Sequence, residues 1–110
     1  MNQKICELFE DKKIMLRDLR RVDLSEFCKK RLFEAYFGVD TKGYYEIVFI
    51  RYAKSRLLKK EALEICELCK RIETKFDTSI RKRTLFFSSQ ICSKSLEIFK
   101  QDGWRTYDFV

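Results

Sequence analysis

Two short polar segments of this chain have the residue types that bind a phosphate group. In the first, Ser88, Ser89 and Gln90 follow an apolar run and precede an amphipathic stretch that predicts a helix. The free backbone N–H groups at the start of a helix, together with the helix dipole, commonly bind anions. Serine is also a frequent N-cap, the residue whose side chain hydrogen-bonds the first turn of a helix. The serine pair therefore has two interpretations, a phosphate-binding turn or a structural cap.

The second polar segment, residues 51–60, is basic and contains no acidic residue. Each of the two segments comes directly after a predicted strand. Ligands of open α/β sheets bind beyond the carboxyl ends of the strands, so we expect the two segments to form one site there. The predicted phosphate ligands are Arg51, Lys54, Ser55, Arg56, Ser88, Ser89 and Gln90, and Lys59 and Lys60 follow nearby.

A secondary basic patch is predicted at the opposite, amino end of the sheet. The sequence IRKR at residues 80–83 precedes the second predicted strand, and further cations lie in the helix before it. The members of this patch are Lys70, Arg71, Arg81, Lys82 and Arg83. Such a surface suits a nucleic-acid backbone, and exposed aromatic rings can stack on bases. The candidate rings are Tyr44, Tyr45, Tyr52, Trp104 and Tyr107, which are equally suited to packing inside the protein.

The elements that position these residues follow from apolar periodicity. Residues 3–22 predict one helix, or two short ones because the apolar stripe is interrupted at 10–13. Residues 23–38 predict a helix with a capping-box-like start and a stop at Gly38. Strands are predicted at 44–52, 84–88 and 104–109, separated by a helix that Ser55 can cap and by a helix at 90–102.

This order predicts one α/β domain, residues 1–110, with a helical N-terminal part (1–38) and a β-α-β-α-β core (44–109). Because strands that alternate with helices pair in parallel, we expect a small three-layer domain with a three-stranded, mainly parallel sheet.

Composition narrows the classes of function. The chain has 110 residues, a net charge of +7 and no His, which removes His-dependent catalysis and the commonest metal ligand. No apolar run approaches the ~18 residues of a membrane span, and the N-terminal residues do not resemble a secretory signal. The five cysteines are odd in number, and Cys66 and Cys69 form an isolated CxxC within a predicted helix. We expect a cytoplasmic protein with reduced, buried thiols and with neither metal nor cofactor.

The stretch GVDTKGYYEIVFIRYAKSR, with the helix and strand that follow it, resembles the core of the restriction-endonuclease-like superfamily. This resemblance implies an acid before a strand and a carboxylate-x-lysine at its end, which together hold Mg²⁺ and activate water. Asp40 and Lys54 match two of these roles, but Arg51 stands near the position of the carboxylate. The resemblance therefore implies a degenerate or divergent nuclease.

Three hypotheses follow from the sequence. The first is a small basic protein, without catalytic residues, that binds nucleic acid or another phosphate-bearing ligand. The second is an assembly module that pairs with a protein partner or its own copy through the C-terminal strand at residues 104–109. The third is the degenerate nuclease.

Overall fold

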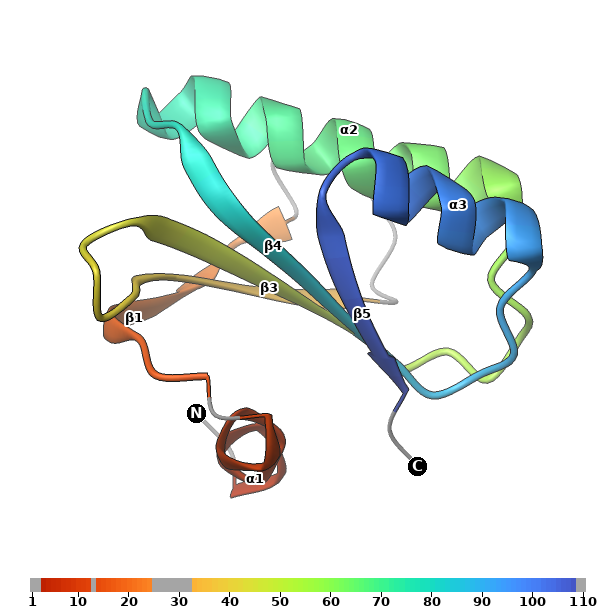
Figure 1. The fold of residues 1–110 in the computed structure, drawn as a ribbon, viewed down its shortest axis with the longest axis horizontal. Helices are drawn as coiled ribbons and strands as arrows, with labels where there is room; N and C mark the ends of the chain where they lie inside the picture. Colours follow the sequence, from red (N-terminus) through yellow and green to blue (C-terminus); the bar gives the residue numbers. More distant parts are fainter. Residues whose placement is uncertain (1–2, 13, 25–32, 109–110) are drawn as a thin grey trace.

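The computed structural model describes residues 3–12, 14–24 and 33–108, which form a layered α/β structure (Figure 1). Its elements in chain order are α1 (Gln3–Asp11), β1 (Arg17–Val22), β2 (Phe33–Val39), β3 (Tyr45–Arg51), α2 (Lys59–Phe76), β4 (Ile80–Phe87), α3 (Ser93–Gln101) and β5 (Trp104–Asp108). The strands form one mixed sheet in the order β1-β2-β3-β4-β5. β1, β2 and β3 pair antiparallel, whereas β3, β4 and β5 pair in parallel.

Two layers of side chains hold the helices against the sheet. α2 and α3 cover one face, and α1 lies against the other (Figure 1). The larger core, on the face of α2 and α3, includes Phe49, Ile65 and Leu85, each 0% exposed. The smaller core contains Phe9 of α1 with Val48 and Phe86. Successive side chains of β3 thus enter different cores, which explains why the strand is apolar without interruption.

The predicted β-α-β-α-β order of the C-terminal part is confirmed, with parallel pairing of its three strands. The three-stranded sheet is wrong, because two more strands, β1 and β2, extend it to five. Residues 17–22 are a strand and not the end of a helix, and the helix expected at 23–38 is a strand from Phe33 onward. Part of that prediction, residues 25–32, lies outside the described residues.

The error has a physical cause in the apolar content of β2. Ala35, Tyr36 and Phe37 are all buried, because the two faces of this strand meet different cores. A strand that is apolar on both faces does not alternate, so its residues also satisfy helical spacing. Pairing with β3 at Ala35–Phe49 and its neighbours decides in favour of the strand.

A tight turn joins β2 to β3, as the DTKG sequence predicts. The Asp40 carboxylate accepts hydrogen bonds from the backbone N–H groups of Lys42 and Tyr44, both at 2.9 Å. Gly43 has φ +87°, a conformation that costs glycine little. Within the described residues, none of the helices combines the length and hydrophobicity of a membrane span.

Candidate functional site

The carboxyl ends of β3 and β4 lie side by side, as the sequence predicts. Arg51 ends β3 opposite Phe87, which ends β4, and the two strands run in the same direction. The loops that follow, 52–58 and 88–92, are held together by a parallel bridge between Leu57 and Ile91. The two segments of the predicted phosphate site therefore meet at one end of the sheet.

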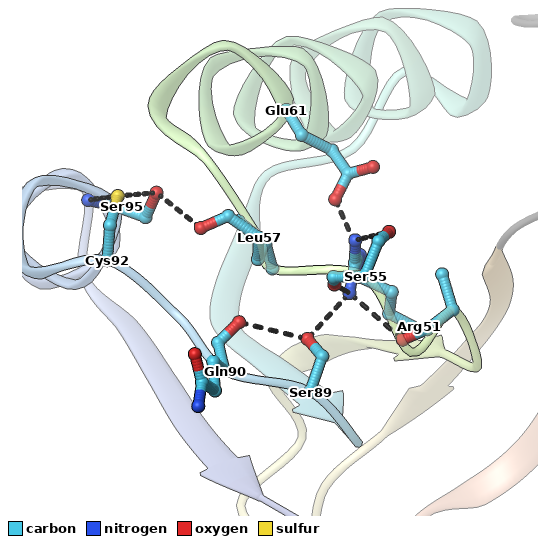
Figure 2. Close-up of polar contacts among 9 residues, drawn as sticks. Arg51, Ser55, Leu57, Glu61, Ser89, Gln90, Cys92 and Ser95 are labelled. Atoms are coloured by element: carbon cyan, nitrogen blue, oxygen red, sulfur yellow. Dashed lines mark hydrogen bonds and ion pairs between the residues drawn. The ribbon is translucent and has the colours of Figure 1, made fainter.

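Arg51, the first predicted ligand, is buried and not available to a ligand in solution. Its side chain is only 1% exposed. The guanidinium pairs with Glu61 at 2.5 Å and donates to the hydroxyl of Ser89 at 2.7 Å (Figure 2). Further bonds reach the carbonyl oxygens of Ala53 (3.1 Å) and Ser55 (2.9 Å), so Arg51 ties together both loops and α2. We conclude that Arg51 is a structural residue of this corner.

The serine pair is not the N-cap of a helix. α3 begins at Ser93, and its N-cap is Cys92, whose sulfur accepts the backbone N–H of Ser95. The Leu57–Ile91 bridge keeps the preceding residues extended, which delays the start of the helix. Ser89 instead accepts from Arg51 and donates to the carbonyl oxygen of Gln90 at 3.1 Å.

The expected cap of α2 is likewise absent. Leu58 is the N-cap residue, and its side chain makes no capping bond. Ser55 instead contacts Arg51, through its hydroxyl (3.3 Å) and through its carbonyl oxygen. Ser55 and Ser89 therefore both accept hydrogen bonds from Arg51 and cap no helix. The sequence pattern of a helix end could not have indicated this role.

The remaining cations of this end are exposed, and one of them, Arg56, lines a pocket. A hollow of about 510 Å³ is lined by Arg56, Phe87, Ser88, Ser89, Gln90, Ile91 and Asp108. The Ser88 hydroxyl is buried there and has no hydrogen-bond partner among the described residues. Arg56, Lys54, Lys59 and Lys60 are exposed, and none pairs with a carboxylate in the described part of the chain. We call these four residues the carboxyl-end cations.

The secondary basic patch does not form one surface. Arg83 lies on the α2 face, where it binds Glu73 and Asp102. Lys82 lies on the α1 face and pairs with Asp40 at 2.8 Å. The other members are exposed: Arg71 pairs with Glu67, Lys70 lies on α2, and the Arg81 guanidinium sits over the Tyr44 ring. The IRKR sequence falls inside β4 and not before it, so its side chains alternate between faces.

A buried charge cluster on the α1 face was missed by the sequence analysis. Asp40 and Glu46 are 5% and 3% exposed. Lys82 and the backbone N–H of Tyr44 lower the pKa of Asp40 to about 2. Burial raises the pKa of Glu46, although Arg105 at 2.8 Å opposes this effect. The two carboxylates are each matched by a cation, so the cluster is typical of a structural network.

The thiols of Cys66 and Cys69 are buried in α2. Burial is the main reason why the pKa of each is raised to about 12. Within residues 3–108, apart from 13 and 25–32, no three His, Cys, Asp or Glu side chains are grouped as metal ligands. The geometry favours packing as the role of the CxxC pair.

The comparisons with solved structures identify the fold. The chain is similar to EndoMS in its apo form, with a TM-score of 0.59 and 12% identity over 99% of this chain and 46% of that chain. It is also similar to a repair endonuclease from Pyrococcus abyssi, with a TM-score of 0.58, 9% identity and 97% and 45% coverage. An EndoMS-dsDNA2 complex matches with a TM-score of 0.54, 10% identity and 96% and 42% coverage.

The chain spans less than half the length of each of these structures. At such low identities the similarity establishes a common fold. No protein-family model and no curated protein matches the chain.

Proposed function

We propose that this chain is a nucleic-acid-binding domain that contacts the phosphate backbone at the carboxyl end of β3 and β4. The observation that carries this proposal is the set of carboxyl-end cations, exposed and without carboxylate partners among the described residues. One of them, Arg56, lines a pocket together with Ser88, Ser89 and Gln90, three of the predicted phosphate ligands. The similar folds include an EndoMS-dsDNA2 complex, which supports the same ligand class.

The binding that we propose is electrostatic and does not use Arg51. The net charge of +7 favours association with a polyanion. Each cation that neutralises a phosphate releases a counterion, so affinity falls steeply as salt increases. Asp108 also lines the pocket and disfavours a phosphate directly beside it. We therefore place the backbone contacts on Lys54, Arg56 and Lys59, in the loop before α2 and at the first residue of that helix.

Binding without cleavage fits this geometry better than a nuclease does. Asp40 precedes β3 and Lys54 follows it, so the two residues lie at opposite ends of a seven-residue strand, roughly 20 Å apart. They cannot hold one metal ion or one water molecule together. At the end of β3, where the resemblance implies a carboxylate, Arg51 is paired with Glu61.

Fluorescence anisotropy with labelled duplex DNA and RNA tests the proposal. We expect binding that weakens between about 50 and 200 mM salt, with a double-logarithmic slope near 0.9 for each phosphate contacted. Replacing Lys54 and Arg56 by Ala should reduce that slope by about one for each cation. Lys100→Ala, an exposed change near the end of α3, is the matched control. Salt-independent affinity, or equal losses in the control, would refute the proposal.

Incubation of the protein with plasmid and Mg²⁺ separates binding from cleavage. We expect intact plasmid, because Asp40 is committed to the turn and to Lys82. Cleavage by the wild-type chain that is lost in Asp40→Asn would replace the binding proposal with the nuclease alternative.

A second candidate function rests on β5. This strand pairs with β4 on one side and is the last strand of the described sheet. Its unpaired side can accept a strand from a second chain. Removing residues 104–110 would not test this cleanly, because Trp104 is 6% exposed and packs in the core. Sedimentation of the intact chain over a wide concentration range is the better test, and a monomer throughout excludes self-association.

A further inference from the structure

Two tyrosines remain exposed at the amino end of β3, far from the carboxyl-end cations. Tyr44 is 43% exposed and Tyr45 is 37% exposed, whereas Phe49, farther along β3, is fully buried. Both follow the turn at residues 40–43 and so stand at the end of the sheet opposite Arg51. A tyrosine ring with this exposure presents a flat apolar surface to solvent.

The turn fixes the backbone of Tyr44. Its backbone N–H donates to the Asp40 carboxylate, and its carbonyl oxygen accepts the Asp40 N–H at 2.8 Å. Lys82 holds the same carboxylate at 2.8 Å. Next to Tyr44, a Cβ placed on Gly43 would meet no heavy atom within 4 Å, so the space beside the turn is open. A residue whose backbone is already fixed loses less conformational entropy when it binds a ligand.

Guanidinium groups already lie against aromatic rings at this end. The Arg81 guanidinium is 5.0 Å from the centroid of the Tyr44 ring. Tyr45 stacks on Phe37 with centroids 5.2 Å apart, and Arg20 covers Phe37 at 5.7 Å. Each tyrosine therefore has a contact on its ring, the exposed Arg81 for Tyr44 and the buried Phe37 for Tyr45, and part of each side chain still faces solvent.

The charges around the tyrosines favour a phosphate backbone. Arg20, Lys42 and Arg81 are exposed at this end. Asp40 is buried and paired with Lys82, which removes its charge from the surface. Two exposed carboxylates also belong to neighbouring elements, Asp18 to β1 and Asp77 to the C-terminal cap of α2, and the three cations outnumber them.

We propose that Tyr44, with the neighbouring cations Lys42 and Arg81, binds unpaired bases of single-stranded nucleic acid; we call these three residues the tyrosine platform. Tyr45 is not part of it, because successive side chains of a strand alternate between faces and Tyr45 packs on Phe37 of the larger core. The Tyr44 ring stacks on a base face while the cations neutralise the adjoining phosphates, a combination that tolerates any base sequence. A duplex hides its base faces, so it can use only the cations. This platform does not depend on the carboxyl-end cations, because it lies at the other end of β3.

A single-stranded oligonucleotide that contains 2-aminopurine tests the platform directly, because the fluorescence of this base falls when it stacks. We expect quenching on binding to the wild-type chain. Tyr44→Ala should weaken single-strand affinity by about five- to 100-fold, the range that alanine substitution of a stacking residue gives. Tyr44→Phe keeps the ring and should stay within about twofold of the wild type. Duplex affinity should change little in either variant.

The controls separate this proposal from the carboxyl-end one. Lys54→Ala combined with Arg56→Ala should leave 2-aminopurine quenching intact while weakening duplex binding. Tyr45 packs on Phe37, so thermal unfolding must accompany any change there, whereas Tyr44 is a turn residue. Absence of quenching, or equal single-strand affinity in Tyr44→Ala and the wild type, overturns the platform. If the Lys54 and Arg56 variant loses only duplex binding and keeps the quenching, the result supports the tyrosine platform as a separate site.

Discussion

Replacing Arg51 by Met is the most informative single perturbation of this fold. The arginine is 1% exposed and bonds to Glu61, Ser89 and two backbone carbonyl groups. Methionine has a similar length but no donor, so the Glu61 carboxylate and both carbonyl oxygens lose their partner. Removing one member of a buried ion pair typically costs about 3–5 kcal/mol of unfolding free energy. Because Glu61 is 16% exposed, water can reach it, and we expect a value near the lower limit.

Urea unfolding followed by the fluorescence of Trp104 measures this change. Trp104 is the single tryptophan of the chain, and its ring packs against Phe49 and Phe99 in the larger core. With a slope of about 1.5 kcal/mol per molar urea, within the range of small proteins, a loss of about 3 kcal/mol lowers the midpoint by about 2 M.

Arg56→Met is the matched control, since it makes the same chemical change on an exposed residue of the same loop. It should alter stability by less than about 0.5 kcal/mol and should weaken nucleic-acid binding. The double variant Arg51→Met with Glu61→Leu should cost less than the sum of the single changes, because the pair acts as a unit.

The structural role of Arg51 would be refuted if Arg51→Met lowered the free energy of unfolding by less than about 1 kcal/mol. Strict additivity of the double variant would refute it as well. Folded Arg51→Met protein that loses nucleic-acid affinity as strongly as Arg56→Met would show that Arg51 is a ligand after all.

Three further predictions concern titration and reactivity. Since the folded pKa of Asp40, about 2, lies below its ordinary value of 3.8, the stability it contributes is lost as pH falls from about 4 to 2. Asp40→Asn should flatten that part of an acid-unfolding curve, and coincident curves would contradict this. Burial raises the pKa of Glu46 above its ordinary value of 4.5. The stability of the folded protein that depends on Glu46 therefore decreases as the pH rises from about 4.5 through the raised pKa. Glu46→Gln should reduce this decline, measured by urea unfolding at several pH values, and an unchanged decline argues against burial as the cause. Hydrogen bonds from Ser95 lower the pKa of Cys92, whereas Cys66 and Cys69 have pKa values of about 12. Brief iodoacetamide treatment followed by peptide mass spectrometry should find Cys92 modified before Cys66 and Cys69. Equal labelling of these three thiols would disprove that burial protects Cys66 and Cys69.

The sequence predicted those parts of the site that depend on neighbouring residues. The DTKG turn was recognised from its own residue types, and Asp40 does bond within four positions of itself. The adjacency of the two loops after β3 and β4 followed from the parallel rule for alternating strands and helices. The burial of Arg51 could not be predicted from local sequence, because two of its side-chain partners, Glu61 and Ser89, stand ten and thirty-eight positions away.

The local sequence pattern also could not predict which aromatic residues are exposed to solvent. Trp104 is buried against Phe99, whereas Tyr44 and Tyr45 are exposed, although all are aromatic residues near the start of a strand. Whether a ring at a strand start is covered depends on what the assembled layers place over it, as Phe49 and Phe99 do for Trp104.

By itself, the sequence determined the C-terminal order of strands and helices, the basic charge and the tight turn at residues 40–43. These features arise from periodicity and from the conformations of single residues, which act over a few positions. Only the tertiary structure decided that Phe33–Val39 is a strand, that Arg51 is internal, and that the two tyrosines face solvent. In each case the deciding energy comes from burial and pairing with residues distant in the chain, which no local pattern contains.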